Sequence, residues 1–128
     1  MIYLDSSVAL AHLLAEDRVP PAALWGEELV TSRLLVYEVG TRLHARGLGR
    51  SHAASARALF DQLALLDLSP EILARGQEAF PGVVRTLDAL HLASIEWLRA
   101  QQVAVRLATY DARLAEAARC LSIPLEPL

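Results

Sequence analysis

Residues 1–14 read MIYLDSSVALAHLL, and this stretch decides which fold we expect for the chain. A short apolar run, IYL, ends at Asp5, and two serines separate it from a second apolar stretch. The run predicts a buried strand, and Ser6 or Ser7 is a residue type that caps the start of a helix. The segment therefore predicts a strand that passes directly into a helix, with an acidic side chain at the junction.

The same alternation of strand and helix continues along the chain. We expect further strands at residues 29–31, 65–68 and 103–109, and a short edge strand at residues 123–125. Helices are expected at residues 22–25, 33–46, 51–63, 86–101 and 111–120, with another that begins at Pro70. Continuous apolar strands are typical of a parallel sheet covered on both faces. The pattern predicts an α/β fold of three layers, α/β/α, around a mostly parallel sheet of four to five strands.

Composition limits the classes of protein that this chain can belong to. Its 128 residues are enough for one domain, which we expect to span residues 1–128, and a hydrophobic content of 54% excludes disorder. A formal charge of −3 excludes a broad basic surface for nucleic acid, so any such contact must be local. All 12 basic residues are arginines.

The start of the chain and its single cysteine bear on location. Cys120 has no partner for a disulfide, no basic segment precedes the apolar start, and no apolar run is long enough to span a bilayer. We therefore expect a cytoplasmic protein.

Four acidic residues are candidates for a site at the carboxyl edge of the sheet, where open parallel sheets bind their ligands. Asp5 directly follows a predicted strand, Asp111 lies two residues after another, Glu38 is on the helix after the second strand, and Asp88 is in the first turn of the helix at residues 86–101. Each has a structural alternative. The three aspartates are at helix starts, where free backbone N–H groups favour an acid. Glu38 shares a helix face with apolar residues and would need a partner such as Arg42.

Together, the four acids suggest a single site. Carboxylates alone select hard cations such as Mg²⁺ or Mn²⁺. Clustered carboxylates repel one another, and a divalent cation relieves that repulsion. A bound cation can also activate water and polarise a phosphoryl oxygen. The residues therefore point to hydrolysis of a phosphodiester.

Four segments of the chain resemble the PIN-domain family, and within it the VapC-type toxins of toxin–antitoxin pairs. They are IYLDSSVAL at residues 2–10, TSRLLVYEV at 31–39, RTLDALHLA at 85–93 and LATYDARLAEAA at 107–118. Their order and spacing extend the resemblance over essentially the whole chain, which is then a single PIN domain with a PIN-like sheet.

The resemblance implies four carboxylate ligands for Mg²⁺ or Mn²⁺: Asp5, Glu38, Asp88 and Asp111. Ser7 and Thr109 occupy positions where the family has a small hydroxyl beside the metal, which orients a carboxylate. It further implies a metal-dependent endoribonuclease that forms a homodimer and is silenced by an antitoxin protein.

Two further residues near the acids have expected roles. His91 lacks partners at a spacing that would make a zinc site, so we expect it to pack or to orient a carboxylate. Arg85, just before the helix that carries Asp88, is the arginine that we expect to contact an RNA phosphate.

Other functions were weighed against a toxin ribonuclease. A phosphatase with an early aspartate as nucleophile would favour a second acid at position 7, but that residue is serine and the chain has no lysine. Within the PIN family, the alternatives are an RNA-processing nuclease outside a toxin–antitoxin pair and a catalytically silent binding module. The intact set of four acids argues against the silent module.

Overall fold

The computed structural model describes residues 1–128. Its strands are β1 (Ile2–Leu4), β2 (Leu29–Ser32), β3 (Ala64–Leu66) and β4 (Arg106–Ala108). Its helices are α1 (Ser6–Leu14), α2 (Arg33–Ala45), α3 (Ala53–Phe60), α4 (Pro70–Gln77), α5 (Thr86–Ala100) and α6 (Ala112–Cys120), with a 3₁₀ helix, η1 (Ala22–Gly26). The strands form one parallel sheet in the order β3-β2-β1-β4. The predicted α/β class and the parallel sheet are confirmed.

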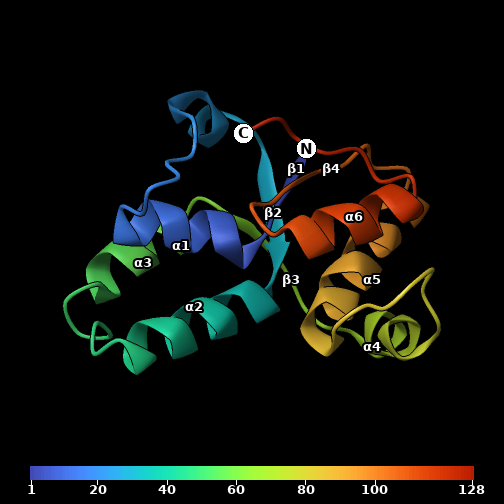
Figure 1. The fold of residues 1–128 in the computed structure, drawn as a ribbon, viewed down its shortest axis with the longest axis horizontal. Coiled ribbons are helices and arrows are strands. Elements are labelled where there is room, and N and C mark those ends of the chain that lie inside the picture. Colours follow the sequence, from blue (N-terminus) through green and yellow to red (C-terminus); the bar gives the residue numbers. More distant parts are fainter.

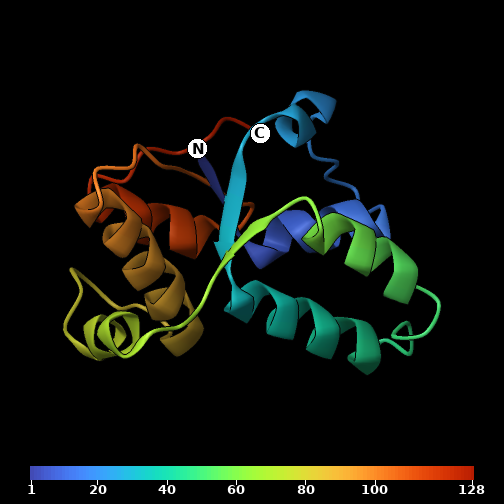
Figure 2. The same cartoon turned by 180° about the vertical axis from the view of Figure 1, so that it is seen from behind.

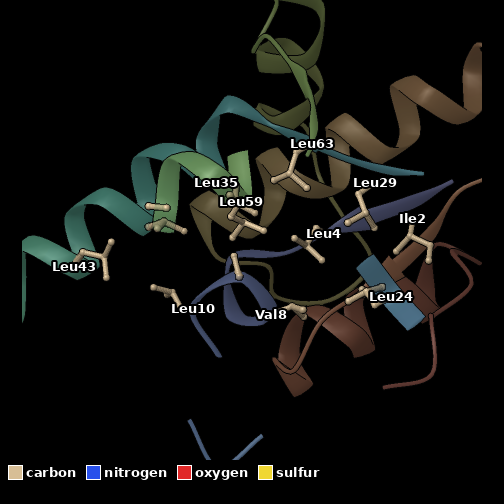
Figure 3. Close-up of a cluster of buried hydrophobic side chains, with 14 residues drawn as sticks. Ile2, Leu4, Val8, Leu10, Leu24, Leu29, Leu35, Leu43, Leu59 and Leu63 are labelled. Atoms are coloured by element: carbon tan, nitrogen blue, oxygen red, sulfur yellow. The ribbon is translucent and has the colours of Figure 1, made fainter. Parts of the chain in front are cut away.

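Helices cover both faces of the sheet (Figure 1). The group α1, α2 and α3 lies on one side and the group α4, α5 and α6 on the other. Successive side chains of β1 point to opposite faces, as strand geometry requires. Ile2 and Leu4 join a core cluster with α1, α2 and α3, whereas Tyr3 joins a second cluster with α5 and α6. Figure 3 shows Leu4 among the labelled side chains of the first cluster.

Several predicted boundaries are wrong, for identifiable reasons. The helix expected at 51–63 is only α3, because residues 50–52 form a turn and the chain has turned again by residue 61. The expected edge strand at 123–125 is reduced to one bridge between Leu107 and Leu125. Pro124 cannot donate a ladder hydrogen bond, which limits any strand there. No helix is long and apolar enough to cross a membrane.

The residues that cap the helices also differ in part from those that the sequence suggested. Asp5, rather than Ser6 or Ser7, caps α1 by accepting a hydrogen bond from the Ser7 N–H. Ser32 is at the start of α2, but its hydroxyl makes no capping bond and is buried without a partner. The predicted start of α4 at Pro70 is confirmed, and Ser69 before it caps the helix by accepting a bond from the backbone N–H of Ile72.

Strand register brings the carboxyl ends of β1 and β4 together. Leu4 pairs with Ala108, and the backbone N–H of Asp5 donates to the Ala108 carbonyl at 3.0 Å. The residue directly after β4 is Thr109, so Asp5 and Thr109 leave the sheet side by side. This junction lies between the two helical layers.

Candidate active site

Three hydrogen bonds hold the Asp5 carboxylate in place. Its Oδ2 accepts bonds from the Ser7 hydroxyl at 2.6 Å, the Thr109 hydroxyl at 2.9 Å and the Ser7 backbone N–H at 3.3 Å. The Ser7 hydroxyl also accepts a bond from the Tyr110 N–H at 2.9 Å, which ties the ends of β1 and β4 together. Asp5 is 4% exposed, so these donors replace water around Oδ2. Ser7 and Thr109 thus lie against Asp5, where hydroxyls that orient it were expected.

Glu38 on α2 is bound by His91 on α5. The Nε2 of His91 lies 2.6 Å from Glu38 Oε1, and its Nδ1 lies 2.8 Å from the Tyr3 hydroxyl. That hydroxyl also accepts a bond from the buried backbone N–H of Ser32. An ion pair with an arginine such as Arg42 was the structural alternative to a metal-binding role for Glu38. The structure shows a different partner, because the fully buried His91 reaches Glu38 from the opposite helical layer.

The neighbours of His91 favour its protonated form. Burial alone lowers the pKa of the imidazole, but Tyr3, Glu38 and Asp5 outweigh burial and raise it to about 10. The Oδ1 of Asp5 is 3.9 Å from Nε2, on the side of Asp5 opposite to its hydroxyl donors. A protein cation therefore lies between two of the four acids.

Arg85 bridges the other two acids. Its Nε donates to Asp88 Oδ2 at 2.9 Å, and its Nη2 donates to Asp111 Oδ2 at 2.5 Å. The second oxygen of Asp111 caps α6 by accepting bonds from the N–H groups of Arg113 and Leu114. The helix-cap role of Asp111 is therefore confirmed, and its two oxygens are divided between the start of α6 and Arg85.

The pKa directions indicate that the aspartates interact. Burial raises the pKa of Asp88, Arg85 opposes this, and the charges of Asp111 and Asp5 add to the increase. Burial also acts to raise the pKa of Asp111, but the N–H groups at the start of α6 and Arg85 outweigh it, and the pKa is lowered. The charges of Asp5 and Asp111 therefore both affect the pKa of Asp88.

All four acids line one cavity of ≈ 620 Å³. The charged residues of its wall are the carboxylates Asp5, Glu16, Glu38, Asp88 and Asp111 and the arginines Arg18, Arg42, Arg46 and Arg85. The residues present fit a hard cation in donor chemistry, since every anionic group is a carboxylate. However, no three acidic, histidine or cysteine side chains are arranged to hold a metal ion as they stand. The acids are held instead by His91 and Arg85.

Two features of this site were not predicted. Tyr3 was counted only as part of a buried strand, and its alternation with Ile2 and Leu4 was the signal that it faces α5. Glu16 and Arg18 reach the cavity from the segment after α1, and no sequence pattern marks them. Arg18 also donates to the Tyr110 carbonyl at 3.0 Å.

Comparisons with known proteins agree with this architecture. A family model of the PIN domain matches residues 2–119. The chain is 31% identical over 126 residues to Ribonuclease VapC47 of Mycobacterium tuberculosis (strain CDC 1551 / Oshkosh), which covers 93% of this chain and 90% of that protein. The crystal structure of Mycobacterium tuberculosis VapC20, described as a Sarcin-Ricin loop cleaving toxin, superposes with a TM-score of 0.71. That match covers 91% of this chain and 95% of the other at 19% identity, and it supports the fold alone.

Proposed function

The chain belongs to the PIN-domain family, and on this premise we propose that it is an endoribonuclease that acts as the toxin of a toxin–antitoxin pair. The observation that carries the proposal is the cavity at the carboxyl edge of the sheet, which all four acids line. The relative of 31% identity is named a ribonuclease, which supports the same activity.

The proposed cofactor is Mg²⁺ or Mn²⁺, held by Asp5, Glu38, Asp88 and Asp111. When bound, the cation would lower the pKa of a water molecule, polarise a phosphoryl oxygen and offset charge on the leaving oxygen. Because Arg85 pairs with Asp88 and with Asp111, its guanidinium must leave both aspartates before both are free for the cation.

The protein's own groups have distinct roles in this proposal. Ser7 and Thr109 fix Oδ2 of Asp5 and leave Oδ1 without a hydroxyl donor. His91 holds Glu38 in one orientation. Arg85 is half-exposed beside the acids. Once released from the aspartates, it is the group that we expect to contact a phosphate of the RNA.

The wider biology of a toxin is part of the proposal. We propose an antitoxin protein as the partner that silences the site, a homodimer as the assembly and the cytoplasm as the location. Large apolar side chains remain exposed on the single chain, among them Val19, Tyr37 and Val83, and a subunit interface would cover some of them. A PIN nuclease outside a toxin–antitoxin pair is the second candidate, and a short upstream gene for a DNA-binding protein would favour the toxin.

Cleavage assays test the nuclease directly. The purified protein should cut mixed single-stranded RNA with Mg²⁺ or Mn²⁺ and stop in EDTA. Asp88→Asn should reduce cleavage by at least about 100-fold. Glu116→Gln is the matched control, because Glu116 is an exposed acid on α6 outside the cavity. Cleavage that persists in EDTA or in Asp88→Asn would show that the metal-carboxylate mechanism is wrong.

A further inference from the structure

The chain has twelve arginines, and they differ in whether the side chain already binds another group of the protein. Seven make a side-chain hydrogen bond or ion pair, for example Arg33 with Asp67 and Arg106 with Glu126. Five make none: Arg42, Arg46, Arg50, Arg57 and Arg113. Of these five, only Arg42 and Arg46 line the cavity that contains the four acids.

The Arg42 side chain makes no hydrogen bond or ion pair, and the nearby acid Glu38 is bound by His91 instead. Glu38 and Arg42 are four residues apart on α2, the spacing at which an acid and a base on a helix normally pair. His91 instead binds Glu38 at 2.6 Å and is itself fully buried, so this partner cannot be lost to solvent. The Arg42 guanidinium is therefore exposed and uncompensated at the wall of the cavity.

Arg46, the C-cap residue directly after α2, continues the same row by one turn. Glu38, Arg42 and Arg46 are spaced by four residues, so Arg42 is about 6 Å and Arg46 about 12 Å along the helix from Glu38. Figure 2 shows α2 leading away from the end of β2 and the sheet. The two arginines therefore form a line that begins at the acids and leads outward.

We propose that Arg42 and Arg46 bind two phosphates of a single RNA strand that continues from the scissile bond along α2. This inference rests on the proposed ribonuclease function and adds where its substrate lies. With a net charge of −3, the chain as a whole repels RNA, so phosphates can approach the acids only where local cations offset that repulsion. A guanidinium without an internal partner can donate two parallel hydrogen bonds to a phosphate.

The dependence of RNA affinity on salt concentration measures these arginine–phosphate contacts. Binding of a fluorescein-labelled 12-nucleotide oligouridine is followed by anisotropy over a series of NaCl concentrations in EDTA, where the proposed chemistry cannot run. Each phosphate contact to a single strand contributes about 0.7 to the slope of log K against log salt concentration. The variant Arg42→Gln/Arg46→Gln should reduce the steepness of that slope by about 1.4.

Arg57→Gln is the matched control, since Arg57 on α3 also has no partner but lies outside the cavity. It should leave the slope unchanged. Equal slopes for the double variant and Arg57→Gln, with circular dichroism showing both folded, would overturn the proposal. So would a double variant that keeps RNA binding but loses binding of a polyglutamate peptide, because the arginines would then receive an acidic protein segment. Cleavage of the same RNA by the unchanged protein in Mg²⁺ is scored separately, so that failure of the nuclease function is distinguished from failure of this contact.

Discussion

The Nε2 of His91 lies 2.6 Å from Oε1 of Glu38, although 53 residues separate them in the chain. This bond joins α5 to α2 across the edge of the sheet. It places a buried imidazole next to an acid of the site, whereas Arg42, one helical turn from Glu38, makes no ion pair.

Stability should depend on pH through His91. Its pKa in the folded protein is raised to about 10, whereas an unfolded histidine has a pKa of about 6.5. The folded state therefore binds the proton more tightly, and the stabilisation is fully present below about pH 6.5 and is lost as the pH rises through about 10. Urea unfolding in EDTA should show a free energy of unfolding that falls over this window.

His91→Gln tests that assignment. The variant should lose about 1–3 kcal/mol at pH 6.5, because a buried hydrogen bond to a charged group is removed. Its stability should also change less between pH 6.5 and 10 than that of the unchanged protein. His52→Gln is the control, since His52 is near the surface and outside the cavity. Parallel pH curves for all three proteins would contradict the prediction.

Arg85→Gln should tighten metal binding. The guanidinium competes with any cation for Asp88 and Asp111, so its removal should raise the affinity for Mn²⁺ and enlarge the increase in melting temperature on titration with Mn²⁺. Without metal, the variant should lose less than about 1 kcal/mol, because the Arg85 side chain is half-exposed. Arg113→Gln provides the comparison, and an identical Mn²⁺ response in both variants would rule out this competition.

Thr109→Val should weaken the site without unfolding the protein. Valine keeps the shape of threonine but removes the hydroxyl that donates to Asp5 at 2.9 Å. We expect Mn²⁺ affinity to fall by about 10- to 100-fold, as for other groups that orient a metal ligand. Calorimetric titration measures this loss. Thr41→Val is the control because the Thr41 hydroxyl bonds only to a backbone carbonyl of α2, and the prediction fails if both variants bind Mn²⁺ equally.

Two substitutions separate the two roles of Asp111. Asparagine is as good a helix cap as aspartate, so Asp111→Asn should retain the bonds from Arg113 and Leu114 and change stability little. Asp111→Ala removes the cap and should cost about 1 kcal/mol. If Asp111 is also a metal ligand, both variants should lose RNA cleavage. Full cleavage by Asp111→Asn would restrict Asp111 to its role as a cap.

Much of the fold was predictable from local pattern. The run IYL followed by an acid predicted a strand that leads into a helix, and later apolar runs predicted further strands. The order of these strands and helices implied a parallel sheet covered on both faces. The ends of the helices and strands were less predictable. Helix α3 is shorter than its apolar pattern, and residues 123–125 make a single bridge, because hydrogen bonding to neighbouring segments decides where an element stops.

The sequence by itself predicted that Asp5, Glu38, Asp88 and Asp111 would gather at one edge of the sheet, and in the structure all four line one cavity. Strand order and alternation carry that information, because the side-chain period of a strand and the shared direction of parallel strands are local properties. Only the tertiary structure decided which cation faces each acid. His91 reaches Glu38 from another layer, and Arg85 bridges aspartates that are 23 residues apart. Such pairings depend on how helices pack across the sheet, since burial and distance set the strength of a charge interaction and neither can be read from spacing along the chain.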